Sequence, residues 1–154
     1  MGPKPDGLRG NESSLHGLSE ALAKTGEALT SDPIGAGTSC LTDLQVMLDR
    51  AVTAYQDPQL RFILFFLSLF IDDIKYNFIG DFPFSDKESE GFQLRDRFLR
   101  ELGETLAQIS KELAASNYGA CTPLAARATG RYLETIKAIN TKYPRAGQDE
   151  RHVG

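Results

Sequence analysis

Residues 61–73 read RFILFFLSLFIDD, and this stretch decides the fold of the chain. It places ten uncharged residues, four of them phenylalanine, between Arg61 and the aspartates Asp72 and Asp73. A helix needs about 20 apolar residues to cross the hydrocarbon core of a bilayer, so this stretch is too short to span a membrane. A helix that is apolar on every side must otherwise be buried on every side. The stretch therefore predicts a buried helix in a globular core.

Turn and capping residues divide the chain into segments of helical character. The segments are residues 13–30, 39–56, 58–79, 86–116 and 123–142. Asp57 before Pro58 is a typical start for the third segment, because aspartate caps helices and proline suits the first helical position. Thr122 before Pro123 predicts the same kind of start for the fifth. No segment keeps the alternation of period two that marks a strand.

Each of the other four segments carries one apolar seam at steps of three and four residues, which places the seam on one helix face. In segment 86–116 the seam is Leu99, Leu102, Leu106, Ile109 and Leu113. At the end of that segment, Asn117 and Gly119 are candidates for a left-handed residue that closes the helix.

The third segment differs, because large apolar residues cover more than one side of it. One side carries Leu60, Ile63, Leu64, Leu67, Ile71, Ile74 and Phe78, and the other sides carry Phe62, Phe65, Phe66, Leu69, Phe70 and Tyr76. The sequence therefore predicts an all-α bundle of five helices in which helix 58–79 is central and four amphipathic helices surround it. Cover by a second copy of the chain is the alternative, so a homodimer stays open.

Length and composition predict one globular domain. The chain has 154 residues, 41% of them hydrophobic, and a net charge of −4; these values are ordinary for a globular protein. We expect a single domain over residues 13–143 between flexible tails at 1–12 and 144–154. Cys40 and Cys121 stand far apart, which favours two free thiols, although one bridge between them remains an alternative. The first residues lack an apolar signal segment, so we expect a cytoplasmic protein.

Three patterns that could carry chemistry are each incomplete. Asp72-Asp73 begins an aspartate-rich magnesium motif on a helix, but the fifth position is Tyr76 instead of aspartate. His16 and Glu20 lie one turn apart, whereas metal sites need three or four ligands. The stretch 35–39, Gly-Ala-Gly-Thr-Ser, offers backbone N–H groups to an anion but has no lysine. We therefore predict no metal, no cofactor and no catalytic residue, with an enzyme using Asp72 and Asp73 as the least favoured reading.

Charge is unevenly distributed along the chain. Residues 123–145 carry five bases against one acid, and residues 11–57 carry seven acids against two bases. Arg127 and Arg131 lie one turn apart and are candidates to bind a carboxylate or phosphate of a partner. The competing interpretation, which we favour, is that the basic last helix packs beside an acidic helix. The overall acidity argues against a nucleic-acid partner.

An apolar loop supplies the remaining partner-binding candidates. Phe82 and Phe84 flank Pro83 in the connection 80–85, where loops are normally polar. They either plug the end of the bundle or anchor a partner protein. The sequence thus predicts a non-enzymatic interaction module, such as an adaptor, assembly factor or small regulatory subunit. The alternative is a binder of a small apolar ligand, held between helices near Phe66, Phe70 and Tyr76.

Overall fold

The computed structural model describes the backbone of residues 3–80 and 86–142, with the side chains of 15–79 and 86–141. Within these ranges every regular element is a helix, and short turns connect the helices. The elements are α1 (Pro3–Ser31), α2 (Ala36–Ala51), α3 (Pro58–Ile74), a π-helical continuation η1 (Lys75–Gly80), α4 (Glu90–Ala114) and α5 (Tyr118–Lys142). The prediction of an all-α bundle of five helices is confirmed. Phe82, Phe84 and the residues after 142 lie outside the described residues.

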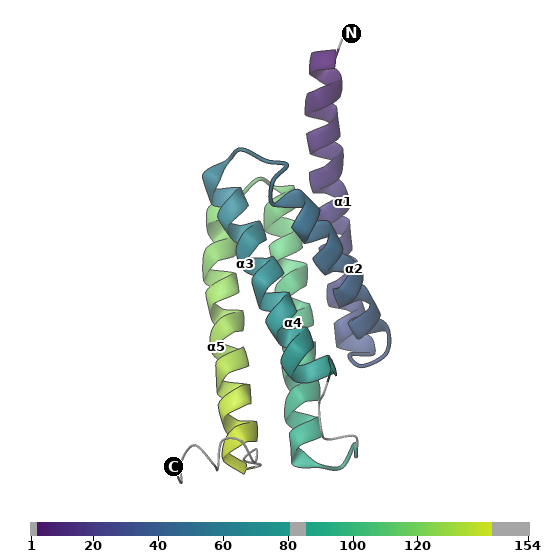
Figure 1. Cartoon of the computed structure of the whole chain (residues 1–154), viewed down its shortest axis with the longest axis vertical. Coiled ribbons are helices and arrows are strands. Elements are labelled where there is room, and N and C mark those ends of the chain that lie inside the picture. Colours follow the sequence, from purple (N-terminus) through teal and green to yellow (C-terminus); the bar gives the residue numbers. More distant parts are fainter. Residues whose placement is uncertain (1–2, 81–85, 143–154) are drawn as a thin grey trace.

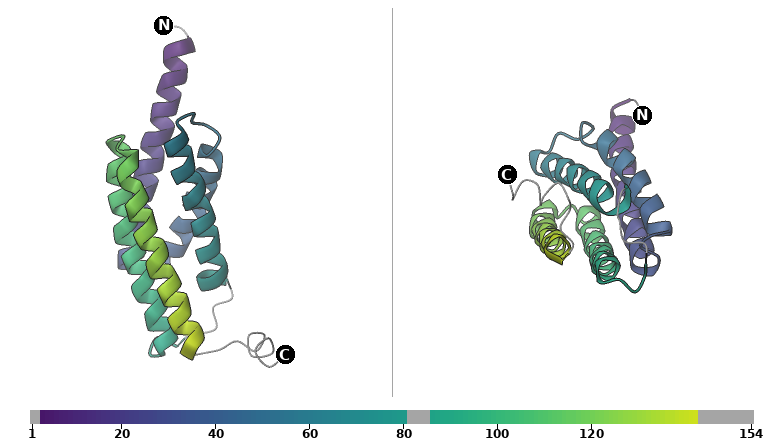
Figure 2. Two further views of the ribbon diagram at one scale, coloured as in Figure 1. Left: turned by 90° about the vertical axis from the view of Figure 1, so that its left-hand side faces the viewer. Right: turned by 60° about the horizontal axis from the view of Figure 1, so that its bottom comes forward.

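The five helices form a ring. Contacts join α1 to α2, α2 to α3, α3 to α5, α5 to α4, and α4 back to α1. Figures 1 and 2 show the same order, with α3 resting between α2 and α5 at one side of the molecule. The first turns of α1 extend beyond the other helices (Figure 1), so this helix begins well before residue 13, where its apolar seam begins.

The apolar seams predicted from the sequence all face the interior of the ring. On α3 and η1 the predicted seam from Leu60 to Phe78 is buried throughout, as is the seam from Leu99 to Leu113 on α4. An aromatic cluster joins four elements at the lower half of the core: the Tyr132 ring lies 5.5 Å from Phe70, 5.4 Å from Phe78 and 5.5 Å from Phe98. Edge-to-face pairs of this kind add to the stability gained from burial alone.

The third helix is not enclosed by the chain, which corrects the expectation of a central helix surrounded by four others. Phe62, Phe65 and Leu69 remain 61%, 52% and 55% exposed. The reason is geometric, because a helix in a ring has two neighbours and one inward face. Its outward face keeps contact with solvent, and no other element in the described part of the chain lies over it.

Two helix starts were predicted, and one is correct. The Asp57 carboxylate accepts hydrogen bonds from the backbone N–H groups of Gln59 (2.9 Å) and Leu60 (3.1 Å), with Pro58 at the first helical position. The prediction for α5 is wrong, because this helix already begins at Tyr118 and contains Pro123 within its second turn. Helix α4 ends in a tight turn at Ser116, so the chain can start α5 directly.

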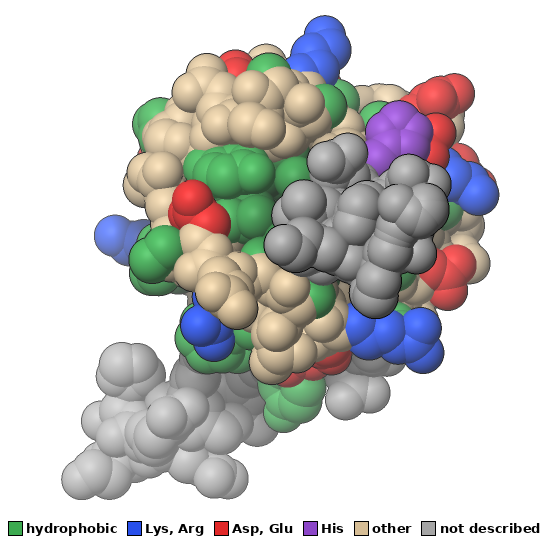
Figure 3. Space-filling view, turned by 90° about the horizontal axis from the view of Figure 1, so that it is seen from above, with side chains coloured by type: hydrophobic (Ala, Val, Ile, Leu, Met, Phe, Trp, Pro, Cys, Tyr) green, Lys and Arg blue, Asp and Glu red, His purple; other side chains and the backbone are tan. Residues whose placement is uncertain are grey.

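The described helices agree with the prediction that segment 61–73 is too short to span a membrane. None of them is both long and apolar enough to cross a bilayer. The end of the bundle that carries the α2–α3 and α4–α5 connections shows hydrophobic side chains in a recess, with most charged side chains toward the rim (Figure 3).

Candidate functional site

The most unusual surface of the molecule is the outward face of α3. Phe62, Phe65 and Leu69 follow one another at steps of three and four residues and form a single stripe, which we call the α3 ridge. Each side chain is more than half exposed, although large aromatic residues normally bury most of their area. The ridge arises because the helix uses its other face, from Leu60 to Ile74, for the core.

Charged residues lie along one flank of the ridge. Asp57 and Arg61 stand exposed near the start of α3, and Asp72 and Lys75 stand near its end. The side chain of Gln45 on α2 joins the second pair: its Nε2 donates to Asp72 (3.0 Å) and its Oε1 accepts from Lys75 Nζ (2.8 Å). The flank therefore has a fixed charge pattern at the α2 side of the helix.

On the opposite flank the ridge borders an apolar groove between α3 and α5. The groove has a volume of about 330 Å³ and is lined by Phe62, Ile63, Phe66, Thr122, Ala125, Ala126 and Thr129. Small residues on α5 leave this space, because alanine and threonine cannot fill the gap beside the phenylalanine rings. The groove and the ridge form one continuous apolar surface through Phe62, which belongs to both.

The three predicted pocket residues occupy different environments. Phe66 lines the groove and stacks on Phe70 with 5.6 Å between ring centroids. Phe70 is buried and meets the Tyr132 ring edge-on. Tyr76 is 75% exposed on η1. The structure thus places Phe66 at the groove, Phe70 in the core behind it and Tyr76 on the open surface.

The two predicted arginines contact α4. Arg127 donates to the Gln108 side chain (3.1 Å), and Arg131 donates to Glu101 (2.5 Å) and also lies 3.5 Å from Glu134. The two arginines thus make intramolecular contacts, although the helices beside α5 are α3 and α4 and not the acidic helices before residue 57. Both guanidinium groups remain exposed.

The acidic pair at the end of α3 takes part in structural contacts. Asp73 Oδ2 accepts a hydrogen bond from the Tyr132 hydroxyl (2.5 Å), and that hydroxyl accepts one from Asn77 Nδ2 (2.8 Å). Asp72 is held by Gln45, as described above. His16 and Glu20 form an exposed pair at 3.5 Å. Among the described residues, no group of three or more potential ligands could hold a metal ion.

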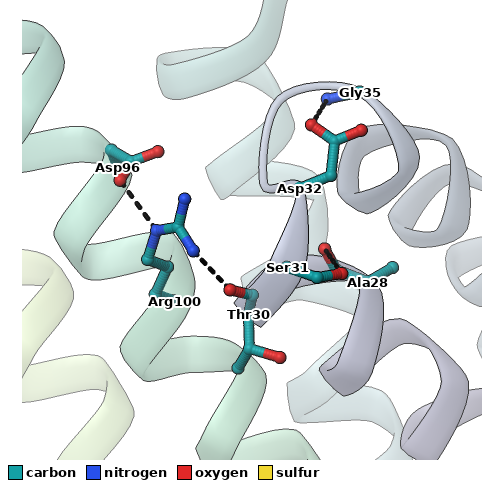
Figure 4. Close-up of polar contacts among 7 residues, drawn as sticks. All are labelled: Ala28, Thr30, Ser31, Asp32, Gly35, Asp96 and Arg100. Atoms are coloured by element: carbon teal, nitrogen blue, oxygen red, sulfur yellow. Dashed lines mark hydrogen bonds and ion pairs between the residues drawn. The ribbon is translucent and has the colours of Figure 1, made fainter.

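A wide cleft lies where the α1–α2 turn meets α4, and Figure 4 shows polar contacts beside it. Its volume is about 850 Å³, and its walls include Asp32, Lys87, Arg95, Asp96, Arg97 and Arg100. Arg100 donates to Asp96 (2.9 Å) and to the carbonyl of Thr30 at the end of α1. These bonds tie α4 to α1, so Arg100 has a structural role here.

At the same cleft the start of α2 is capped by the chain itself. The Asp32 carboxylate accepts from the backbone N–H groups of Ala36 (3.0 Å) and Gly35 (3.2 Å), and these two bonds hold the pKa of Asp32 below its usual value. Of the backbone donors considered for an anion at residues 35–39, those of Gly35 and Ala36 are used by the Asp32 carboxylate, and that of Gly37 by the Asp32 carbonyl. Residues 36–39 of this stretch form the first turn of α2, with Gly35 as its N-cap.

The sequence contained a signal for the α3 ridge, but the expected environment was wrong. Phe62, Phe65 and Leu69 were recognised as apolar residues off the main seam, and the missing information was the number of neighbours that α3 has. Comparisons of the chain with protein-family models, with curated proteins and with solved structures found no match.

Proposed function

We propose that this chain is a non-enzymatic protein-interaction module that acts through the α3 ridge. The observation that carries the proposal is the exposure of three large apolar side chains on one stripe of a helix whose other face is core. Burying one such side chain stabilises a protein by roughly 1.5–3 kcal/mol. A folded chain that leaves three in solvent has a surface suited to a partner, and aromatic residues are the usual anchors of such surfaces.

Other observations support a binding role over catalysis. The candidate acids Asp72 and Asp73 are hydrogen-bonded to Gln45 and Tyr132, and these contacts serve the packing of α3 against α2 and α5. The cytoplasmic setting is also a proposal. Its support is that Cys40 and Cys121 are both free thiols, as is usual in a reducing compartment.

Site-specific photo-crosslinking tests the proposal. A photoreactive phenylalanine analogue is placed at position 65 of the ridge or at position 111, where Lys111 is exposed on α4 across the ring. After irradiation in the cells that produce the chain, we expect a discrete protein adduct at position 65 and none at position 111. Equal labelling at both positions, or no adduct at position 65, contradicts the proposal. The loop residues Phe82 and Phe84 and the arginines Arg127 and Arg131 remain predicted contributors.

The groove between α3 and α5 favours a second candidate function, the binding of a small apolar ligand. Pockets for such ligands are mostly apolar and have volumes of about 300–1,000 Å³, and the groove of about 330 Å³ falls at the lower end. Substituting Ala126→Phe fills the groove without adding charge. If this candidate is right, titration with a fluorescent apolar probe gives saturable binding of one probe per chain that the substitution abolishes. Weak, unsaturable binding that Ala126→Phe leaves unchanged rejects it.

A further inference from the structure

The charged residues beside the α3 ridge form one acid–base pair at each end of it. Read from the start of the helix, the flank carries Asp57, Arg61, Asp72 and Lys75, so the signs run minus, plus, minus, plus. The ridge between Arg61 and Asp72 is uncharged. Asp57 and Lys75 are 18 residues apart, which is five whole turns of a helix, and Arg61 and Asp72 are 11 residues apart, close to three turns. Helical geometry therefore keeps all four on one flank.

The two opposite-charge pairs share one midpoint. The point halfway between Asp57 and Lys75 is residue 66, and the point halfway between Arg61 and Asp72 lies directly after it. The middle of the α3 ridge, near Phe65, falls within one residue of this point. A two-fold axis through it would bring the start of one α3 against the end of the other. Such an axis places each charged residue of one copy opposite a residue of opposite charge on the other copy.

We infer that the partner of the α3 ridge is a second copy of this chain, bound with the two α3 helices antiparallel. In this arrangement Phe62, Phe65 and Leu69 of both copies pack against each other at the axis. Arg61 of each copy faces Asp72 of the other, and Asp57 faces Lys75. Antiparallel helices set like flanks against each other, so the charged flank of one copy meets that of the other. A parallel pair in register would set like charges together.

Within one chain these charged groups make other contacts: Asp57 caps α3, and the Gln45 side chain bridges Asp72 and Lys75. At 1.5 Å of rise per residue, Arg61 and Asp72 are about 16 Å apart along α3, too far for a direct bond within one helix. Asp57 and Lys75 are farther apart still. Each opposite-charge pair becomes a contact only when a second α3 lies alongside, which is the reason for choosing a copy of this chain as the occupant.

The size of the surface fits a weak dimer. Taking roughly 200 Å² for each side chain, the exposed parts of the ridge amount to on the order of 300 Å² per copy. Standard stable interfaces bury about 800 Å² per partner, so the ridge needs Phe66 and the charged flank to complete the contact. We therefore expect association at micromolar concentrations.

Sedimentation equilibrium at about 1–100 µM tests this inference, which rests on the proposed function. We expect the mass to rise from 16.9 kDa toward twice that value with concentration. Phe65→Glu should leave a monomer at all concentrations. Leu133→Glu is the matched control, because Leu133 is an apolar residue of similar exposure on α5, and it should associate like the parent chain.

A charge exchange tests the orientation. Arg61→Asp or Asp72→Arg alone places two like-charge contacts in the dimer and should weaken association by about tenfold at low salt. The double variant restores opposite signs across the axis and should recover association to within about threefold. Circular dichroism spectra that match the parent chain show that each variant is folded, and a variant that fails this check is replaced by Arg61→Glu or Asp72→Lys.

The outcomes separate this inference from the proposed function. A chain that stays monomeric, or one whose association ignores Phe65→Glu, overturns the homodimer. A double charge variant that associates no better than either single variant overturns the antiparallel arrangement. If the crosslink at position 65 joins two copies of the chain, the inference is supported. If it joins a different protein while the purified chain stays monomeric, the proposed function stands and the inference falls.

Discussion

Tyr132 illustrates how a single buried polar atom is accommodated in this core. Its ring belongs to the aromatic cluster, and its hydroxyl lies between Asp73, to which it donates, and Asn77, from which it accepts. Burial raises the pKa of Tyr132, and the hydrogen bond with Asp73 adds to the rise, because both favour the neutral hydroxyl. Hydrogen bonds of this kind stabilise a fold by about 1 kcal/mol each.

We predict that Tyr132→Phe lowers the free energy of unfolding by about 1–2 kcal/mol at pH 7. Tyrosine in the unfolded chain loses its proton near pH 10, whereas folded Tyr132 keeps it to higher pH. Its contribution is therefore full below pH 10 and declines as the pH rises above that value. Between pH 7 and pH 11 the free energy of unfolding should fall less for Tyr132→Phe than for the parent chain. Urea unfolding at each pH measures this difference. Tyr76→Phe, at an exposed tyrosine, is the control. It should change neither the free energy of unfolding at pH 7 nor its decline between pH 7 and pH 11.

Ser116 carries the left-handed conformation that the sequence placed at Asn117 or Gly119. Its φ is 59°, and the N–H groups of Ser116 and Asn117 donate to the carbonyls of Leu113 (3.0 Å) and Glu112 (2.8 Å). This pattern closes α4 and needs a residue with positive φ. Residue preference could not locate it, because the hydrogen bonds of the turn and not the nearest glycine decide which residue takes this conformation.

Ser116→Gly is expected to stabilise the chain by about 1 kcal/mol, since glycine adopts positive φ without the clash that a Cβ atom causes. Thermal or urea unfolding measures the gain. Ser116→Ala serves as the comparison, because it removes the hydroxyl but keeps the Cβ atom. If the glycine and alanine variants are equally stable, the backbone conformation is not the cause.

At the scale of the helices, the periodic seams could be predicted and the neighbours could not. Steps of three and four residues identify the face of α3 that is buried, and this face was predicted correctly from Leu60 to Phe78. The same pattern does not state how many helices surround α3. Five helices can place one in the middle or close a ring, and the ring exposes Phe62, Phe65 and Leu69. The candidate site was therefore present in the sequence as residues but not as a surface.

The contact between α1 and α4 depends on two glycines. A Cβ atom built on Gly26 would lie 2.5 Å from the carbonyl oxygen of Gly103, and one on Gly103 would lie 2.5 Å from the carbonyl oxygen of Gly26. The two helices thus touch backbone to backbone, and the neighbouring atom on each side cannot move without moving its helix.

Gly103→Ala should destabilise the chain by about 1–3 kcal/mol, because the added methyl group forces α1 and α4 apart. In an open helix position the same change stabilises by up to about 1 kcal/mol. Gly130 provides that control, since a Cβ atom there meets nothing within 4 Å. Urea unfolding of both variants should give shifts of opposite sign. A gain in stability for Gly103→Ala would show that the two helices separate at little cost.

For the whole molecule, the ring defines which residues the fold requires. The described core begins on α1 at Leu18, with Leu15 packed against it. The turns of α1 before these residues project past the other helices (Figure 1). The predicted domain boundary at residue 13 stays a prediction, because side chains are described only from Leu15 onward.

A chain that starts at residue 13 is expected to keep its free energy of unfolding within about 0.5 kcal/mol, because no described core residue is lost. Its helical circular dichroism per molecule should fall in proportion to the residues removed. A loss of more than about 1 kcal/mol would show that the removed segment contributes packing to the bundle. Concentration must be held constant in this comparison, because self-association raises apparent stability.

The paired glycines of α1 and α4 also limit how this protein can diverge. Most core positions tolerate substitution when a neighbour changes size in compensation, but Gly26 and Gly103 face carbonyl oxygens, which no mutation can shrink. A larger residue at Gly26 or Gly103 cannot be accommodated by a smaller side chain elsewhere. At Gly17 and Gly130, by contrast, an added Cβ atom meets open space. Descendants of the same ancestor are thus expected to retain the first two glycines after much of the surface has changed. The pair of glycines at positions 26 and 103 can therefore help to identify distant relatives in sequence searches.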